Sequence, residues 1–286
     1  MKAKKFEINT PLPGLRLRGK LMGLSEPRIM GILNATPDSF FAASRVQSHN
    51  DALKQAEQML EAGADILDLG AYSTRPGAAE ISVEEEGARL FDLVEKISQT
   101  FPEAVLSIDT FRSEIAREAL LRGAHIVNDI SGATDDPAIL QVAAEFDVPF
   151  ILMHKKGTPS TMQQNPHYED VLAEVFSYFS SQIEKARGAG VKQIVLDPGF
   201  GFGKNTEHNY TLMRHLDYFH SLGLPILVGI SRKGMIWRNL GINADEALNG
   251  TTVLHTLSLL KGSQILRVHD VKEAVEVQRI MEFYSP

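Results

Sequence analysis

The stretch QIVLDPGFGFGK, residues 193–204, decides the fold. Its apolar residues 194–196 indicate a short buried strand, which ends at the carboxylate of Asp197. Pro198 stops the strand because it lacks an N–H donor, and the glycines after it allow a tight turn close to a ligand. Parallel α/β sheets build sites from a polar strand end followed by such a loop. The alternative is a tight turn whose aspartate caps the next helix. The site interpretation is favoured because the same pattern recurs along the chain.

The same rhythm of apolar strand, polar strand end and amphipathic helix recurs along the chain. Strands alternate with helices, one of which is expected at 208–222. The predicted strands lie at 29–33, 65–69, 104–108, 125–127, 149–153, 194–196, 225–228 and 264–266. Eight such units have the length of a (β/α)8 barrel, the TIM barrel. An open doubly wound sheet is less favoured, because no G-x-G-x-x-G motif opens a helix after the first strand. No linker interrupts the pattern, so we expect residues 1–286 to form a single domain.

A short N-terminal β-hairpin is predicted ahead of the barrel. Residues 6–9 and 15–20 alternate weakly around a turn that contains two prolines and a glycine. We expect this hairpin to plug or cover one end of the barrel.

The composition limits the possible functions. The chain has 286 residues, of which 43% are hydrophobic, and no cysteine, which excludes disulfides and thiolate metal sites. Its net charge is -7, which argues against nucleic-acid binding through a general basic surface. The N-terminus has no apolar run of the signal-peptide kind and no segment is long and apolar enough to span a membrane, so a cytoplasmic protein is expected.

Polar residues follow the predicted strands at the end where TIM barrels hold their active sites. These positions are Asn34, Asp68, Asp109, Asn128, His154, Asp197, 231–233 and 267–269. Each also has a structural explanation: Asn34 could cap a turn, Asp68 and Asn128 could support a neighbouring loop, and a lone histidine such as His154 is more often a satisfied rim residue than a metal ligand. A structural role for all of them together is improbable.

The charges at this end separate into two groups. Lys233, Arg267 and His269 follow the last two strands, where barrels commonly hold phosphate, and a short helix predicted at 235–240 would add free N–H groups. Asp109, Asn128 and Asp197 are expected across from them, as acceptors and donors for a nitrogen-rich heterocycle. The residues alone therefore suggest a heterocycle that carries a phosphate or pyrophosphate.

From Arg28 onward the chain resembles the dihydropteroate synthase family. The motifs that carry the resemblance are ILNATPDSF (32–40), STRPGA (73–78), SIDT (107–110), NDISG (128–132), DPGFGFGK (197–204), SRK (231–233) and RVHDV (267–271). The resemblance implies a TIM barrel that joins p-aminobenzoate to 6-hydroxymethyl-7,8-dihydropterin pyrophosphate. The products would be 7,8-dihydropteroate and pyrophosphate, on the route to folate. The resemblance also implies a homodimer and inhibition by sulfonamides.

The resemblance assigns roles to individual residues. It places the pterin ring on Asp109, Asn128, Asp197 and Lys233, and the pyrophosphate on Asn34, Arg267 and His269. It places p-aminobenzoate, and sulfonamides, beside Phe40, Thr74, Arg75, Pro76 and Phe202. Lys233, Arg267, His269 and Asp109 would be catalytic. Mg²⁺ would bind at Asn34, which is plausible as a single protein ligand because Mg²⁺ keeps waters and relies on substrate phosphates.

The chain departs from the family pattern at three places. Family members often continue the first motif with an acid and two glycines, whereas this chain reads FAASR at 41–45. Tyr72 stands where a glutamate is common, and Gly234 where a serine often follows the lysine. These changes bear on loop dynamics and sulfonamide sensitivity more than on the reaction. A corrinoid-type pterin methyltransferase and a non-catalytic pterin-binding paralogue are the alternatives, and the STRP, SRK and RVHDV motifs argue against both.

Two loops, residues 34–49 and 70–83, are long for connections between a strand and a helix. They contain the expected arylamine contacts, and we expect them to be mobile until the pterin pyrophosphate is bound. The sequence therefore predicts ordered binding, with p-aminobenzoate second.

Overall fold

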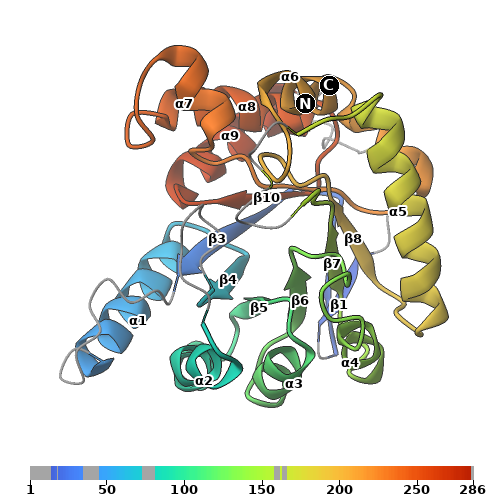
Figure 1. The fold of residues 1–286 in the computed structure, drawn as a ribbon. Coiled ribbons are helices and arrows are strands. Elements are labelled where there is room, and N and C mark those ends of the chain that lie inside the picture. Colours follow the sequence, from blue (N-terminus) through green and yellow to red (C-terminus); the bar gives the residue numbers. More distant parts are fainter. Residues whose placement is uncertain are drawn as a thin grey trace.

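Parallel strands form the centre of the molecule, and helices surround them (Figure 1). The computed structural model describes residues 14–17, 19–34, 45–72, 81–157, 162 and 166–284. Within these residues lies an eight-stranded parallel sheet. Its strands are β3 (Arg28–Asn34), β4 (Ile66–Gly70), β5 (Val105–Asp109), β6 (Ile126–Asp129), β7 (Phe150–Met153), β8 (Ile194–Asp197), β9 (Leu227–Val228) and β10 (Ile265–Val268).

The sheet closes into a barrel. Neighbouring strands follow the order β8-β7-β6-β5-β4-β3-β10-β9, and a parallel bridge between Leu196 and Ile226 joins the two ends of that order. The predicted TIM barrel is therefore confirmed, and the open doubly wound alternative is wrong.

Helices alternate with the strands, as the sequence predicted. They are α1 (Arg45–Glu61), α2 (Val83–Thr100), α3 (Ser113–Leu121), α4 (Ile139–Glu145), α5 (Val171–Gly188), α6 (Thr206–Arg214), the 3-10 helix η1 (Leu216–Leu222), α7 (Gly234–Leu240), α8 (Leu248–Leu260) and α9 (Val271–Tyr284). Polar side chains fix several of their starts. The Asp170 carboxylate accepts the N–H groups of Leu172 and Ala173 at α5, and Asn205 forms a capping box with His208 at α6.

The N-terminal hairpin consists of β1 (Leu15–Leu17) and β2 (Lys20–Met22), which pair in antiparallel fashion. The described hairpin pairs 15–17 with the strand that follows it, whereas residues 6–9, the expected partner, lie outside the described part of the chain. The predicted plug is confirmed. The buried side chains of Leu15 and Leu17 pack with one inward-facing residue from each of seven strands: Met30, Ile66, Ile126, Ile151, Val195, Leu227 and Ile265.

The barrel interior changes from apolar to polar along the strands. Successive side chains of a strand alternate between its two faces, so residues two positions apart point the same way. Two positions beyond the apolar layer, the strands carry Asp68, Asn128, Asp197 and Arg267, of which the first three are buried. The apolar layer thus forms the floor of a polar pocket at the C-terminal ends of the strands.

Two predicted boundaries need correction. The expected helix over 208–222 is divided, because α6 ends at Arg214 and a tighter 3-10 turn continues the chain. Helix α1 already begins at Arg45, inside the predicted loop 34–49. Residues 35–44 and 73–80, which make up most of both long loops, lie outside the described residues. Among the helices described, none combines the length and apolarity needed to cross a bilayer.

Candidate active site

Two carboxylates, an amide and a guanidinium meet in the polar pocket. Arg267 donates from Nε to Oδ2 of Asp68 and from Nη2 to Oδ2 of Asp109, each over 2.6 Å. Asn128 donates from Nδ2 to the same Asp68 oxygen over 3.0 Å. The expectation that Asp109 lies across the pocket from Arg267 is wrong. Both side chains point into the barrel, where their opposite charges attract strongly.

This charge cluster perturbs the titration of its members. Burial raises the pKa of Asp109 to about 7; the charge of Arg267 opposes this shift, and the Asp68 carboxylate adds to it. Burial alone would lower the pKa of Arg267, but the charges of Asp68 and Asp109 outweigh it, and that pKa is raised. Asp109 therefore changes charge near neutral pH while Arg267 stays cationic.

Asp197 and Lys233 form the other side of the site. Asp197 ends β8, and its Oδ1 accepts the Gly199 N–H over 2.8 Å. Lys233 donates from Nζ to the Phe200 carbonyl over 2.5 Å, and Nζ lies 4.6 Å from the centre of the Phe202 ring. Burial raises the pKa of Asp197 against the attraction of Lys233, and burial lowers the pKa of Lys233 to about 8 against the attraction of Asp197.

The glycine-rich loop after β8 is held from inside by Lys204, whose side chain is fully buried. Its Nζ donates to the carbonyls of Gly199 (2.9 Å) and Phe202 (3.1 Å) and contacts Nδ1 of His154 at 2.9 Å. Burial, reinforced by the positive charge of Lys204, lowers the pKa of His154 to about 2, so the ring is neutral and Nδ1 can accept. His154 thus has the structural role that the sequence analysis favoured for it.

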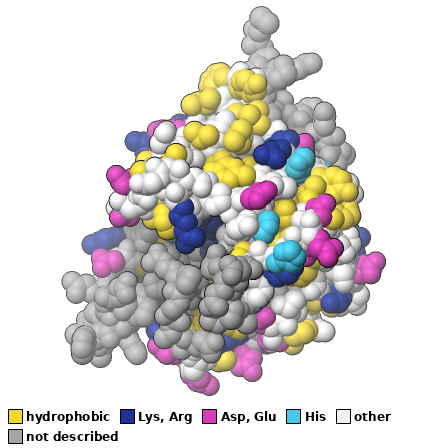
Figure 2. All heavy atoms as spheres, turned by 45° about the horizontal axis from the view of Figure 1, so that its top comes forward, with side chains coloured by type: hydrophobic (Ala, Val, Ile, Leu, Met, Phe, Trp, Pro, Cys, Tyr) yellow, Lys and Arg dark blue, Asp and Glu magenta, His cyan; other side chains and the backbone are white. Residues whose placement is uncertain are grey.

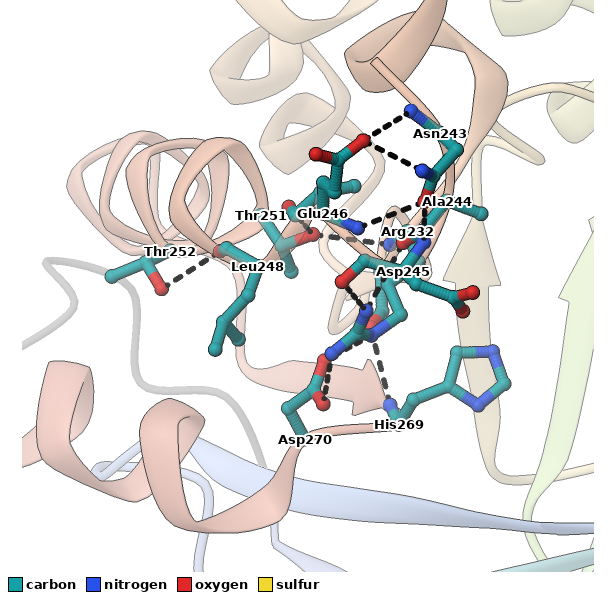
Figure 3. Close-up of polar contacts among 12 residues, drawn as sticks. Arg232, Asn243, Ala244, Asp245, Glu246, Leu248, Thr251, Thr252, His269 and Asp270 are labelled. Carbon is teal, nitrogen blue, oxygen red and sulfur yellow. Dashed lines mark hydrogen bonds and ion pairs between the residues drawn. The ribbon is translucent and has the colours of Figure 1, made fainter.

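The side chain of Arg232 fixes the loop that carries Lys233. The backbone of Arg232 has a φ of 53°, which is uncommon for a residue other than glycine. Its Nε and Nη2 each donate to one oxygen of Asp270 over 2.8 Å, and Nη1 donates to the carbonyls of Ala244 and Asp245 (Figure 3). Asp270 follows His269, whose backbone N–H donates to Ser231 Oγ over 3.2 Å. The His269 side chain is exposed, and its ring points away from the Arg232–Asp270 pair in Figure 3.

Asn34 lies at the rim of the same pocket. It is the exposed last residue of β3, and in the sheet Gly70 lies between it and Asp109. A Cβ on Gly70 would come within 3.2 Å of the Asp109 Cβ, so glycine leaves the carboxylate its place. Phe202 is described and half-buried, whereas Phe40, Thr74, Arg75 and Pro76, the other expected arylamine contacts, lie outside the described residues.

On the face shown in Figure 2, the described basic, acidic and histidine side chains are interspersed among hydrophobic ones, and no continuous basic patch covers it. In the described part of the chain, no three histidine or carboxylate side chains are grouped as a metal cage.

A family model described as pterin binding enzyme matches residues 30–269. The dihydropteroate synthase of Escherichia coli strain K12 is 49% identical over 267 residues, which cover 93% of this chain and 94% of that protein. The chain belongs to the dihydropteroate synthases, in the pterin-binding enzyme family.

Solved structures of dihydropteroate synthases have the same fold. The Yersinia pestis enzyme, solved in complex with a sulfonamide drug, superimposes with a TM-score of 0.88 at 42% identity and covers 94% of this chain and 98% of its own. The Xanthomonas albilineans enzyme, solved with 4-aminobenzoic acid, gives a TM-score of 0.87 at 38% identity, with 95% and 97% covered. The family match extends from β3 to His269 and thus includes every charged residue of the pocket.

Sequence reasoning missed three residues that support the site of this dihydropteroate synthase. Glu86, in the first turn of α2, is fully buried and accepts hydrogen bonds from Thr110 and Arg112, each over 2.7 Å. Lys204 and Arg232 belong to the DPGFGFGK and SRK motifs, but the sequence analysis assigned them no role. The glycines around Lys204 were a usable signal, since a lysine ending a tight glycine loop can reach its carbonyls; nothing in the sequence indicated the partner of Arg232.

Proposed function

We propose that the pocket joins p-aminobenzoate to 6-hydroxymethyl-7,8-dihydropterin pyrophosphate, giving 7,8-dihydropteroate and pyrophosphate. One observation carries the proposal: the acceptors Asp109, Asn128 and Asp197 and the cations Lys233 and Arg267 share one pocket above an apolar floor. Acceptors in that number suit the N–H groups of a pterin, and the cations suit the phosphates attached to it.

The pterin ring is proposed to lie between β5, β6 and β8. Asp197 uses Oδ1 for the Gly199 N–H, so its second oxygen can accept from the pterin. Lys233 is the N-cap residue of α7, and its ammonium stands beside the Phe202 ring, between the proposed pterin and arylamine positions.

The leaving pyrophosphate is proposed to meet Arg267, His269 and Asn34. As the bond between the exocyclic methylene carbon and the ester oxygen breaks, its electron pair goes to pyrophosphate, and cations near that oxygen stabilise the developing charge. The pterin ring shares the positive charge left on the methylene. The arylamine nitrogen then bonds to that carbon and releases a proton, so no strong general base is needed.

Mg²⁺ is proposed to bind with the pyrophosphate at Asn34, where it would neutralise phosphate charge. The donor set suits this ion: Asn34 offers an amide carbonyl at an exposed rim, and Mg²⁺ takes most of its ligands from water and phosphate.

The arylamine side is proposed to consist of Phe202 together with Phe40, Thr74, Arg75 and Pro76. The Yersinia pestis relative solved with a sulfonamide and the Xanthomonas albilineans relative solved with 4-aminobenzoic acid support this ligand class for the present chain. We infer the same inhibitor class here.

The chain is also proposed to form a homodimer through α8 and α9. These helices expose Val253, Leu257, Leu260, Ile280 and Phe283, an unusual number of large apolar side chains for neighbouring elements. Sedimentation should give a dimer that Leu257→Asp with Ile280→Asp dissociates. A matched exposed position on α3, Leu121→Asp, should leave the dimer intact. A monomeric parent chain would contradict the proposal.

Pyrophosphate release measured with both substrates present tests the reaction. Release that requires p-aminobenzoate, pterin pyrophosphate and Mg²⁺ together is the expected result. Pterin binding without release would instead identify a non-catalytic pterin-binding protein, and methyl transfer from a methylated pterin would identify the corrinoid-type alternative. The cytoplasmic location stays a prediction.

A further inference from the structure

Asp68 occupies a central place in the pocket that neither the sequence reasoning nor the proposed substrate contacts explain. It points inward from β4 and is fully buried. Both of its hydrogen bonds use Oδ2, which accepts from Asn128 Nδ2 at 3.0 Å and from Arg267 Nε at 2.6 Å. Its other oxygen, Oδ1, has no hydrogen-bond partner among the described residues. One carboxylate oxygen thus joins a proposed pterin contact to a proposed pyrophosphate contact.

The contact with Asp68 determines which way the Asn128 amide faces. An amide has a donor nitrogen and an acceptor oxygen on opposite branches. Because the Asn128 nitrogen donates to Asp68, its oxygen points away from Asp68 and can only accept. The pterin-facing groups of Asp109, Asn128 and Asp197 are then all acceptors, as a ring that presents N–H donors requires. A reversed amide would place a donor against those N–H groups.

The contact between Asp68 and Arg267 has a different consequence. Arg267 is held by two carboxylates, and its second partner is Asp109 at 2.6 Å. A pterin that hydrogen-bonds to Asp109 competes with Nη2 for that carboxylate. Asp68 lies below the proposed pterin position, one layer above the apolar floor, so its hydrogen bond with Arg267 Nε is retained. The guanidinium is therefore still anchored when Nη2 turns to the pyrophosphate.

We propose that Asp68 is a positioning residue for this reaction: its Oδ2 sets Asn128 as an acceptor for the pterin and keeps Arg267 in place for the leaving pyrophosphate. The inference rests on the proposed function. A purely structural role, in which Asp68 only balances the buried charge of Arg267, predicts lost stability without a selective effect on one substrate.

The experiment uses two substitutions at Asp68 and a control one strand away. Asp68→Ala removes the acceptor and the charge, whereas Asp68→Asn keeps an acceptor oxygen and removes the charge. Ser107→Ala is the matched control. Ser107 lies opposite Asp68 in the register with β5 and is equally buried, and its hydroxyl has no hydrogen-bond partner among the described residues. Pterin affinity is measured by calorimetry with 6-hydroxymethylpterin, and steady-state kinetics are measured with each substrate varied separately.

We expect Asp68→Ala to weaken pterin affinity and lower kcat by tenfold or more each, while the KM for p-aminobenzoate changes less than twofold. Asp68→Asn should lose less pterin affinity than Asp68→Ala, because it can still orient Asn128, but it should lower kcat at least threefold. Ser107→Ala should match the parent chain within twofold. Wild-type kcat and pterin affinity in folded Asp68→Asn and Asp68→Ala would overturn the proposal. If Asp68→Ala does not fold, unchanged kcat in Asp68→Asn overturns it alone.

A double-mutant cycle separates positioning from simple support. In an Asn128→Ala background the amide is already gone, so Asp68→Ala should cost less pterin affinity than it does in the parent chain. Equal costs in both backgrounds would contradict an action through Asn128. A parent chain that binds pterin but releases no pyrophosphate would refute the proposed reaction and leave the pterin-affinity part of this test intact.

Discussion

Arg267 Nη2 lies 2.6 Å from Oδ2 of Asp109, the carboxylate proposed to hold the pterin. An incoming pterin would compete with this contact for the Asp109 carboxylate, and the guanidinium end concerned is the one proposed to meet the pyrophosphate. The Arg267 side chain thus connects the proposed pterin and pyrophosphate subsites directly.

The pH dependence should be narrow. The ionised Asp109 carboxylate accepts the pterin N–H groups more strongly than the protonated acid does, so activity should rise with pH through its pKa of about 7. Lys233 is cationic only below its pKa of about 8, so activity should fall as the pH rises further. We expect a bell-shaped kcat/KM for the pterin substrate, since this quantity reports the free enzyme. Asp109→Asn should remove the ascending limb from whatever activity remains. A flat profile across both pKa values would contradict these assignments.

Asp197→Asn should weaken pterin binding while the barrel stays folded. The substitution removes a charge-assisted acceptor and can present an amide donor to the pterin N–H groups, at a cost of about 2–3 kcal/mol of affinity. Calorimetry with the folded variant measures this loss. The amide oxygen can still accept the Gly199 N–H, so the loop should keep its shape. Unchanged pterin affinity would exclude Asp197 from the site.

Arg267→Ala should destabilise the fold as well as the reaction. It leaves the buried Asp68 carboxylate without its cation, and breaking such a pair costs about 3–5 kcal/mol. Urea unfolding should show that loss at pH 8 and a smaller one at pH 5, where Asp109, the second partner of Arg267, is protonated because burial raises its pKa to about 7. Arg117→Ala, which breaks an exposed pair with Glu145, is the control and should change stability little.

The kinetics of the same variant should separate the two substrates. Arg267→Ala should raise the KM for the pterin pyrophosphate and lower kcat, whereas Lys233→Ala should affect both substrates because Lys233 lies beside Phe202. A change confined to the arylamine KM in Arg267→Ala would show that the subsites are assigned the wrong way round.

Lys204→Met should loosen the glycine-rich loop. The Phe202 carbonyl loses its donor, and the Gly199 carbonyl keeps only the Phe202 N–H; leaving a carbonyl unpaired costs about 1–3 kcal/mol. Hydrogen exchange over residues 199–204 should become faster, and pterin affinity should fall with it. Lys192→Met, a substitution of an exposed lysine paired with Asp147, is the control and should change neither.

Arylamine binding should depend on pyrophosphate. If p-aminobenzoate binds only after the pterin pyrophosphate and Mg²⁺, its affinity should increase by a coupling free energy of about 1–3 kcal/mol when pyrophosphate and Mg²⁺ are present. Equilibrium dialysis with and without pyrophosphate measures the difference. Equal affinities would rule out ordered binding.

The sequence predicted the barrel because each strand is short, apolar and followed by a polar residue. That pattern located Asp109 and Asp197 at the last residues of their strands and Asn128 next to the end of its strand, where the structure has them, whereas Asp68 lies in the middle of β4. It could not show that Arg267 contacts Asp109, since the width of a barrel and the direction of a long side chain are set by packing.

Other features had no local signal. The division of the helix at Arg214 falls where neither proline nor glycine marks it. The burial of Glu86 follows from Thr110 and Arg112, which are distant in sequence, so its position in the first turn of α2 suggested only a favourable helix dipole.

The number of paired residues between neighbouring strands differs around the barrel. Most neighbouring strands are joined by several paired residues, but in the described structure β8 and the segment before β9 share only the Leu196–Ile226 bridge. Asp197 and Lys233 stand on opposite sides of this thin seam, and the hydrogen bond from Lys233 to Phe200 crosses it. Lys233 therefore links the two segments in addition to its proposed contact with the ligand. A molecule that binds both Asp197 and Lys233 would link the two segments that this single bridge joins, so filling the pocket should stiffen the whole barrel.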